Sequence, residues 1–390
     1  MTPPLAIVHL AKYYPPEQGG MESVTQVLAE GLASQGATVK VVCFTKQQAR
    51  SDRMAGVQVE RLAVGLERAS QPLGWRYAVQ GLRAARAADI VHLHAPNLLA
   101  SLMSLLLPRR VKLLVHWHSD VVGKGWLGAL VRPVEGWMIR RADLVVATSE
   151  AYAQASPWLV AAGPKVQVIP IGIHPPGPAA GETKPGAIDR DFEPFLRGRS
   201  LVLAVGRLVP YKGFDVLLDA ARHLPEDMAV VIGGSGPQAK ALQAQLLANG
   251  LGDRVLMPGR LSEGELDTLF ARAQQFCLPS VERSEAFGVV LLEAMSRGLP
   301  CVATHIEGSA TAWVNQHDES GLNVPPADPQ ALAAALLSLA RDGALRERLA
   351  QGARQRYQAL FTGQRFVAAL RRAYQHLLAS AGPHPPRQRR

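Results

Sequence analysis

The 390-residue sequence lacks a long hydrophobic run and contains only three cysteines. Its richest apolar stretch, residues 97–108, is shorter than the roughly 20 residues that a membrane-spanning helix needs, so it predicts a buried helix. The opening residues carry no basic segment and no cleavage motif, which predicts that no secretory leader is present. Cys43, Cys277 and Cys301 lie far apart within apolar runs, and this favours reduced core thiols in a cytosolic protein over a disulfide framework or a metal cluster.

Acidic charge is scarce in the first half of the chain. Residues 1–175 carry 18 Lys and Arg against 11 Asp and Glu, whereas residues 176–390 carry 24 against 21, within a total net charge of +10. Such a basic excess is typical of a protein that binds nucleic acid or an anionic membrane surface, or of a protein whose surface is simply basic and soluble. No aromatic stacking platform is interleaved with this charge, so a nucleic-acid-binding or other non-enzymatic binding module ranks last among the interpretations.

Hydrophobic residues make up 48% of the chain, and its length exceeds one ordinary core, so two domains are expected. Short apolar runs without clean alternation recur between helical stretches, first at 5–10, 38–44, 89–94, 112–118, 143–149 and 166–172, then at 201–206, 229–236, 254–259, 275–280 and 300–304. Such runs are typical of strands that are covered on both faces, and they predict two doubly wound α/β domains with parallel sheets.

The stretch between the two sets is rich in Pro, Gly and charge, which predicts a linker. We therefore expect an N-terminal domain at residues 1–174, a linker at 175–199, a second domain at 200–360, and a C-terminal helix with a basic tail at 361–390.

Ligands of doubly wound sheets bind beyond the carboxyl ends of the strands, so the residues that follow each strand are candidates. Gly19 and Gly20 follow the first strand, where paired glycines let the backbone approach an anion. His118 ends a later strand. Arg207 and Lys212 lie on a loop that enters a helix, which suits a diphosphate clamp. The plainer interpretations are a turn, a structural histidine and a solvated loop.

Two glutamates, Glu285 and Glu293, flank an apolar run in the segment "SVERSEAFGVVLLEAM". Residues 288–298 predict a helix, with Glu285 at its N-terminus and Glu293 in its second turn. Eight helical residues advance roughly 12 Å, about the reach from a sugar ring past two phosphates to a ribose. Carboxylates accept hydrogen bonds from vicinal hydroxyls, and helix N–H groups favour phosphate. A nucleotide-diphosphate sugar would satisfy this array, whereas chance spacing is the plain alternative.

Two other motifs favour different chemistry. Residues 234–239 match the dinucleotide fingerprint G-x-G-x-x-A, but Asp253 precedes the next strand instead of following it, so an NAD-dependent dehydrogenase is kept only as an alternative. Asp189, Arg190 and Asp191 form a D-x-D motif of the kind that metal-dependent sugar transferases use. Because this motif lies in the expected linker and not after a strand, we interpret it as a solvated charge run.

Taken together, these segments resemble glycosyltransferase family 4, the retaining GT-B enzymes. The match runs along nearly the whole chain through "GGME", the histidine after a strand of the first domain, "VGRLVPYKG", "GGSGP" and "ERSEAFGVVLLEAMSRGLPCVAT". More narrowly, "HWHSD", "SVERSEAFG" and "WVNQHDESGLNVPP" resemble bacterial mannosyl- and rhamnosyltransferases that build lipid-linked surface polysaccharide. The resemblance implies a GT-B fold, with two Rossmann-like domains facing a central cleft and the final helix crossing back to the first domain.

The resemblance also implies roles for individual residues. Glu285 would bind donor-sugar hydroxyls and Glu293 the ribose hydroxyls, while Arg207 and Lys212 would hold the diphosphate as charge develops on it. Gly20 would let its loop close over the phosphates. The implied catalytic residues are His118 (beside the sugar), Arg207, Lys212 and Glu285; the implied donor-binding residues are Gly19, Gly20, Arg207, Lys212, Arg260, Leu261, Glu285, Phe287, Gly288, Val289 and Glu293. One departure is His174, which stands where relatives commonly have aspartate.

No cofactor, no metal and no nucleic acid are implied. The expected partners are a nucleotide-sugar donor, with GDP-mannose or a GDP-deoxyhexose favoured by the narrower resemblance, and a saccharide or lipid-linked acceptor. A GT-B sugar epimerase is the second enzyme class, and a nucleotide-sugar binding module that binds the donor without turnover is the non-enzymatic alternative. The enzyme is expected in the cytoplasm, peripheral on the inner face of the membrane. Residues 125–141 put apolar side chains at helical spacing, which indicates either a membrane face or a core helix; these are Trp126, Leu130, Val134, Trp137 and Met138, flanked by Arg132, Arg140 and Arg141.

Overall fold

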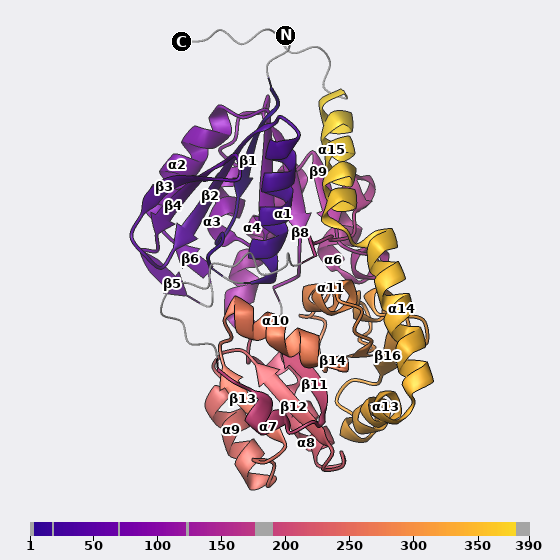
Figure 1. Ribbon diagram of the computed structural model, residues 1–390. Coiled ribbons are helices and arrows are strands. Elements are labelled where there is room, and N and C mark those ends of the chain that lie inside the picture. Colours follow the sequence, from indigo (N-terminus) through magenta and orange to yellow (C-terminus); the bar gives the residue numbers. More distant parts are fainter. Residues whose placement is uncertain (1–3, 18, 69–70, 122–124, 176–189, 380–390) are drawn as a thin grey trace. The chain divides into compact units, whose positions relative to one another are not determined.

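A computed structural model describes residues 4–17, 19–68, 71–121, 125–175 and 190–379 (Figure 1). The chain divides into two compact units. The first comprises Met1–Ile173 together with Gly363–Arg390, and the second comprises His174–Thr362. The three cysteines are free and buried, as expected.

The first unit is built on an eight-stranded sheet in the order β10-β9-β8-β7-β1-β2-β4-β3. All neighbouring strands are parallel except β3 and β4. The strands are β1 (Ala6–Leu10), β2 (Thr38–Thr45), β3 (Arg50–Met54), β4 (Val57–Ala63), β7 (Ile90–Ala95), β8 (Lys112–Trp117), β9 (Leu144–Ala147) and β10 (Val166–Val168). A separate antiparallel pair consists of β5 (Leu66–Arg68) and β6 (Gln71–Leu73).

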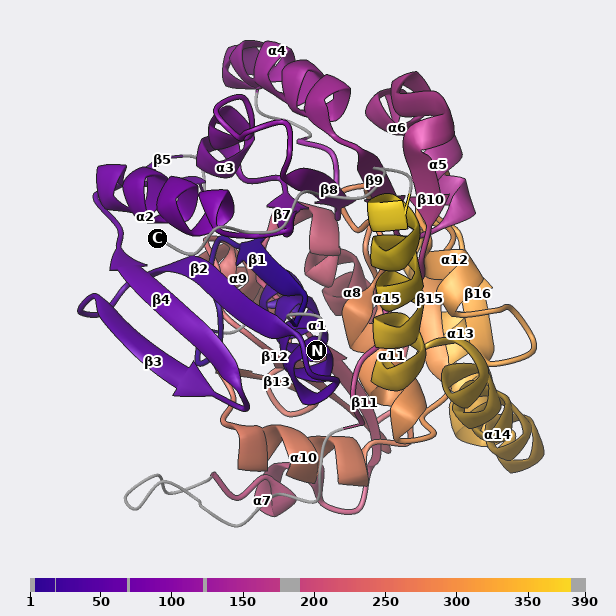
Figure 2. The same ribbon diagram turned by 90° about the horizontal axis from the view of Figure 1, so that it is seen from above.

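Helices cover both faces of this sheet, with α1 and α15 together on one side and α2, α3 and α4 on the other (Figure 2). The helices are α1 (Gly20–Ser34), α2 (Trp75–Arg86), α3 (Leu98–Ser104), α4 (Gly125–Arg141), α5 (Glu150–Ala155), α6 (Pro157–Ala162) and α15 (Gly363–Ala379), with a 3-10 turn η1 (Gly163–Lys165). Side chains fix two of the helix starts, because Asn97 accepts from the Ala100 amide and Ser149 from the Tyr152 amide.

The β3 edge of the first sheet was not predicted from the sequence. The sequence of β3 is RSDRM, and this strand pairs antiparallel with β4. A charged edge strand leaves its side chains in water and discourages pairing with another chain. Because β3 has no apolar run, the hydrophobic pattern gave no signal for it.

The second unit is built on a six-stranded sheet in the order β13-β12-β11-β14-β15-β16, with all neighbours parallel. The strands are β11 (Ser200–Val205), β12 (Met228–Gly233), β13 (Val255–Gly259), β14 (Gln275–Leu278), β15 (Cys301–Thr304) and β16 (Gly321–Val324). Strand order runs outward in opposite directions from β11 and β14. The point where the order reverses therefore lies between these two strands, and open α/β sheets bind ligands at such a point.

The helices of the second unit enclose an apolar core that includes Leu217, Ile232 and Leu336. They are α7 (Glu193–Leu196), α8 (Phe214–Ala221), α9 (Ala239–Ala248), α10 (Glu263–Arg272), α11 (Val289–Ser296), α12 (Thr311–Val314), α13 (Pro329–Arg341) and α14 (Gly343–Leu360), with a 3-10 turn η2 (Pro210–Lys212). A capping box of Ser262 and Glu265 begins α10.

The expected linker at 175–199 falls mostly on residues 176–189, which lie outside the described residues, as does Asp189. Its end is structured. Arg190 Nε lies 2.5 Å from Glu265 Oε1, and the Arg190 guanidinium lowers the pKa of Glu265 to about 2. The interpretation of Arg190 as part of a solvated charge run is therefore wrong, because Arg190 ties this segment to α10.

Candidate functional site

The candidate site lies where two loops meet beyond β11 and β14. Gly213 ends the first loop with a φ of +65°, and a Cβ there would lie 2.0 Å from the Pro279 carbonyl oxygen. The Val281 amide donates to the Tyr211 carbonyl at 2.8 Å. Only glycine allows this approach and this φ, so the two loops are held together at the point where the strand order reverses.

Contact between the loops brings Lys212 and Glu285 together. Lys212 Nζ lies 2.5 Å from Glu285 Oε2, with the two side chains only 11% and 10% exposed. Ser280 Oγ donates to the same oxygen at 3.0 Å, and Ser309 Oγ donates to the Glu285 carbonyl at 2.5 Å. Burial lowers the pKa of Lys212, but the Glu285 carboxylate together with Tyr211 and Glu293 outweighs burial, so the pKa is raised. Lys212 is therefore a buried, permanently charged ammonium group.

Glu293 lies in α11 and is half-buried. Burial raises the pKa of Glu293 to about 7, against the opposing charges of Arg297 and Lys212. The charge of Lys212 thus acts on both glutamates. The expected helical spacing of the two glutamates is wrong, however, because α11 begins at Val289 and Glu285 lies in the preceding loop.

The start of α11 is fixed by Gly288 and Phe287. Gly288 is the N-cap with a φ of +80°, a left-handed conformation that favours glycine. Phe287 is buried and packs edge-on against Trp313 and Phe361. Its side chain therefore anchors the loop instead of facing a ligand, and Val289, half-buried, opens the helix behind it. The first N–H groups of α11 provide partial positive charge at this edge of the sheet.

The other donor-binding candidates of the second unit divide into exposed and buried residues. Arg207 and Arg260 are exposed, and neither side chain forms an ion pair with a described residue. Leu261 is buried and fills the space beside Gly233, where a Cβ would lie 2.3 Å from Leu261 Cδ1. Leu261 therefore supports the end of β12, whereas the two arginines are available to an anion.

The glycines of the dinucleotide fingerprint have a structural explanation. A Cβ on Gly234 would lie 1.8 Å from the Gly206 carbonyl oxygen, and one on Gly236 would lie 2.3 Å from the Leu208 carbonyl oxygen. The Leu208 amide also donates to the Ser235 carbonyl at 3.0 Å. Both glycines are thus required by the packing of the loop after β12 on the loop after β11, which explains them without a dinucleotide.

Sequence reasoning missed the polar residues behind Glu285. Thr304 Oγ1 donates to the Ser280 carbonyl, and Thr311 Oγ1 donates to the Thr304 carbonyl at 3.0 Å. With Ser309, these side chains fix the backbone around Glu285. The sequence could have indicated two of them, because Ser280 and Thr304 lie at the carboxyl ends of adjacent strands, where polar residues gather around ligands.

In the first unit, His118 directly follows β8 and is 7% exposed. Its Nε2 lies 3.0 Å from His94 Nδ1, and its ring stacks on His116 at a centroid distance of 4.3 Å. Burial, with a smaller contribution from Lys12, lowers the pKa of His118 to about 3. His116 lies two residues before His118, and the stacked rings lie on the same side of the strand. The neighbouring His9, His92 and His94 were not recognised.

Gly19 and Gly20 mark the start of α1. Gly20 is its first residue, and Gly19 is extended, with its carbonyl accepting from the Ser23 amide at 3.0 Å. A Cβ on Gly19 would lie 2.2 Å from Glu22 Oε2. Gly20 thus begins the helix directly after the loop that precedes it, and it contributes a first-turn N–H group.

None of the helices in the described part of the chain is both long enough and apolar enough to cross a bilayer.

Two family models match consecutive parts of the chain. Residues 19–172 match a glycosyl transferase 4-like domain, and residues 188–356 match glycosyl transferases group 1. The D-rhamnosyltransferase WbpZ of Pseudomonas aeruginosa is 31% identical over 360 residues, which cover 92% of each chain. The O-antigen chain mannosyltransferase C of Escherichia coli is 28% identical over 385 residues, covering 96% of this chain and all of that one.

Solved structures also share the fold. The sucrose-phosphate synthase of Thermosynechococcus elongatus superposes with a TM-score of 0.77 at 22% identity, over 96% of this chain and 100% of that one. The Anabaena protein Alr3699/HepE in complex with UDP-glucose superposes with a TM-score of 0.74 at 20% identity, over 95% and 100%.

Proposed function

This chain belongs to the group 1 glycosyltransferase family, and from that premise we propose that it is a retaining hexosyltransferase of surface-polysaccharide assembly. The donor would be GDP-mannose or a GDP-deoxyhexose, and the acceptor a saccharide or a lipid-linked oligosaccharide. The observation that carries the proposal is the buried ion pair of Lys212 and Glu285 at the reversal point of the second sheet. The names of the mannosyl and rhamnosyl relatives support the choice of sugar.

We assign Lys212 to the diphosphate of the donor. Cleavage of the bond to the sugar places negative charge on the departing phosphate, and a fixed cation in a water-poor site stabilises that charge. Because Glu285 keeps Lys212 protonated, no proton has to be gained before the ammonium group can act. The exposed Arg207 and Arg260 and the first N–H groups of α11 supply further positive potential at the same edge.

We assign the hydroxyls of the transferred sugar to Glu285. Lys212 and Ser280 both engage Oε2, and no described residue donates a hydrogen bond to Oε1, so Oε1 is the oxygen offered to the sugar. Glu293 is assigned to the ribose hydroxyls, since hydroxyl donors would stabilise the carboxylate that burial disfavours. In the first unit, His118 is assigned to the sugar and the start of α1 at Gly20 to an anionic group.

We propose membrane contact through a different surface from the one expected. Of the two interpretations of α4, the described residues favour a helix packed on the core: Met138 is buried, Arg141 pairs with Asp143 at 3.2 Å, and α4 continues through Pro133. The side chains of Trp126 and Leu130 lie outside the described residues. Only Trp137, with 46% exposure, remains as a large exposed apolar side chain on the described part of α4.

Exposed apolar side chains gather on α2 and on α3 with the turn after it, which lie together on one side of the first sheet (Figure 2). Trp75 is 72% exposed and Leu106 is 63% exposed. We call this the α2–α3 surface; it comprises Trp75, Val79, Leu102, Leu105 and Leu106, with exposed Arg76, Arg83, Arg86, Arg109 and Arg110. Apolar side chains among arginines suit an anionic headgroup region, where a lipid-linked acceptor would be found.

Product analysis tests the proposal directly. Purified protein with GDP-mannose and a mannose-terminated oligosaccharide should yield an oligosaccharide extended by one hexose, detected by mass spectrometry, with the anomeric configuration read by NMR. A changed donor sugar without a new glycoside would identify an epimerase instead.

We also propose that transfer needs no divalent metal. Turnover that EDTA abolishes and magnesium restores would contradict this, and would return attention to Asp189 and Asp191.

A further inference from the structure

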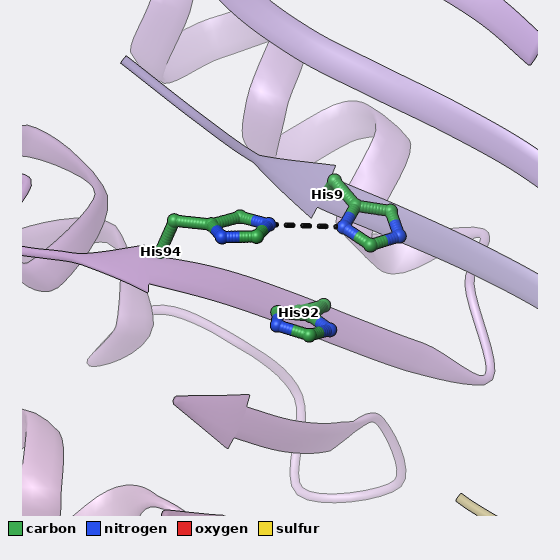
Figure 3. Close-up of side chains that lie close together, drawn as sticks. All are labelled: His9, His92 and His94. Atoms are coloured by element: carbon green, nitrogen blue, oxygen red, sulfur yellow. Dashed lines mark hydrogen bonds between the residues drawn. The ribbon is translucent and has the colours of Figure 1, made fainter. Parts of the chain in front are cut away.

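Five buried histidines of the first unit form two hydrogen-bonded rows beneath α15. In the first row, His9 Nδ1 lies 3.1 Å from His94 Nε2, and His94 Nδ1 lies 3.0 Å from His118 Nε2. We call this row the imidazole chain. Figure 3 shows the rings of His9 and His94 end to end, with His92 stacked against their junction. In the second row, Tyr374 Oη lies 2.5 Å from His92 Nδ1, and His92 Nε2 lies 3.2 Å from His116 Nδ1.

Strand register gathers these rings on one face. His9 of β1 pairs with His92 of β7, and His94 of β7 pairs with His116 of β8. Because side chains two residues apart share a face, His94 and His118 join the same layer. The imidazole chain therefore runs across three neighbouring strands, from the middle of β1 to the end of β8.

Burial keeps the chain neutral. Desolvation lowers the pKa of His9 to about 3 and that of His94 well below its ordinary value. Desolvation also lowers the pKa of His118. A neutral imidazole has one N–H and one lone pair. Each contact between rings holds a single proton, so the tautomers are linked: if His9 donates to His94, then His94 must donate to His118.

The inner end of the chain decides the direction. His9 Nε2 is sealed from solvent and has no hydrogen-bond partner among the described residues. If His118 donated inward, the proton of His9 would have to lie on this nitrogen and would form a buried, unpaired N–H group. The opposite direction leaves only a lone pair there. Orphaned buried N–H groups are rare, and unpaired acceptors are better tolerated, so the protons point from His9 towards His118.

We propose that the imidazole chain holds His118 as the neutral tautomer with its proton on Nδ1, which makes His94 and His9 positioning residues for sugar transfer. The role given to His118 rests on the proposed function. Nε2 is engaged by His94, so the ring presents Nδ1–H as a hydrogen-bond donor, and this nitrogen forms no hydrogen bond with a described residue. A sugar hydroxyl oxygen is the acceptor that such a donor fits. The nearby charge of Lys12 opposes a second proton on the ring.

A transition metal is the other occupant that the cluster suggests, because His9, His92 and His94, or His94, His116 and His118, place ligand nitrogens within 4.8 Å of one another. Ring orientation disfavours it. A metal lies in the plane of each ligating ring, yet His92 stacks on His94 at 4.5 Å and His116 stacks on His118 at 4.3 Å, each within 13° of parallel. Neither triad includes a carboxylate, so a divalent charge would be buried without compensation.

The tautomer can be read directly by NMR. Protein labelled with 15N-histidine should show, for His118, a protonated Nδ1 and an unprotonated Nε2, with the resonances assigned through a His118→Asn variant. A proton on Nε2, or averaging between the two nitrogens, would overturn the proposal. So would a stoichiometric transition metal in the purified protein. This measurement does not depend on turnover.

Kinetics test the positioning role, with His92 as a matched control. His92 lies on the same strand and the same face as His94 and is equally buried, but its ring nitrogens bond to Tyr374 and His116 instead of His118. His94→Leu should lower kcat at least about tenfold, the scale on which outer hydrogen bonds orient a histidine in metal sites. His94→Asn, whose amide can donate to His118 Nε2, should recover most of the loss. His92→Leu should retain kcat.

Equal kcat losses in His94→Leu and His92→Leu, at matched melting temperature, would show a merely structural role and would overturn the proposal. A wild-type protein without transferase activity would refute the proposed function instead, while the NMR result would still decide the direction of the chain.

Discussion

The two units share a doubly wound parallel sheet but bury their polar side chains in different places. In the second unit, Ser280, Glu285 and Thr304 cluster at or beyond the strand ends, and the core under α8 is apolar. In the first unit, His9 and His92 lie within strands. Polar groups beyond strand ends can reach a ligand, whereas polar groups within strands must satisfy one another. The second unit therefore has a binding edge at its strand ends, whereas the first unit has an internal hydrogen-bonded layer.

The largest expected effect concerns the binding edge. Lys212→Ala and Glu285→Ala should each lower the rate of transfer by more than about a hundredfold, the scale for a group that acts on developing charge. Lys212 ends the 3-10 turn η2 and Glu285 lies in a loop, so truncation should lower stability by breaking the buried ion pair but should leave the fold intact by circular dichroism. Lys240→Ala, on the exposed face of α9, is the matched control and should retain activity. Near-normal turnover in either site variant would refute the assignment.

Acid should destabilise the first unit through its histidines. The folded pKa values of His9 and His118 are about 3, below the unfolded value of 6.5, so their contribution to stability is complete above pH 6.5 and is lost as the pH falls towards 3. At pH 5, the loss in the free energy of unfolding should be about 2 kcal/mol for each residue. His92, His94 and His116 should add to it in the same direction.

Glu293 should make the stability of the second unit change with pH in the opposite direction. Its folded pKa is raised to about 7 from an unfolded value of 4.5, so stability falls as the pH rises through this window. Calorimetry between pH 8 and pH 5 should therefore resolve two transitions that move in opposite directions on acidification. An exposed-histidine control, His223→Gln, should leave both trends unchanged. A first-unit transition that is insensitive to pH would mean that the five rings are not buried as described.

The contact between the two loops can be tested at Gly213. Gly213→Ala forces an L residue into a φ of +65° and places its Cβ 2.0 Å from the Pro279 carbonyl oxygen. Gly250→Ala is the matched control, because Gly250 has a φ of +66° with no atom within 4 Å of the added Cβ. Overpacking typically costs 1–3 kcal/mol, so urea titration should show Gly213→Ala less stable than Gly250→Ala by about that amount. Equal losses would mean that the loops are not in contact.

Liposome binding by arginine variants can distinguish membrane contact through the α2–α3 surface from contact through α4. Replacing Arg83, Arg86 and Arg110 together should weaken sedimentation with anionic liposomes by about 1 kcal/mol for each charge. Replacing Arg132 and Arg140 on α4 should have a smaller effect. If the wild-type protein stays in the supernatant at low salt, or if the α4 variant loses more binding, then the chosen surface is wrong.

The sequence predicted the strands and the loops of the second unit well, for a physical reason. Fully buried parallel strands are continuous apolar runs, and Lys212 and Glu285 lie in the connections that follow two of them. The likeness to solved structures confirms the GT-B fold with two Rossmann-like domains. The burial of Phe287 could not be predicted, because its aromatic partners Trp313 and Phe361 lie far away in the sequence.

The histidine layer of the first unit could be predicted from the sequence only in part. The spacing of His92 and His94, and of His116 and His118, already placed each pair on one face of a strand. Their meeting with His9 required the strand order β8-β7-β1, which no local pattern carries. Likewise β16 was missed because its four residues follow a polar turn and have no apolar run.

Binding of the donor at the Lys212–Glu285 edge is the central claim, and thermal stabilisation tests it most directly. At a hundred times its dissociation constant, GDP-mannose should stabilise the wild-type protein and Lys240→Ala by about 2.7 kcal/mol, and the shift in Tm should vanish in Lys212→Ala. Stabilisation by UDP-sugars but not by GDP or GDP-mannose would contradict the proposed donor. A Tm shift that persists unchanged in Lys212→Ala would contradict the site itself.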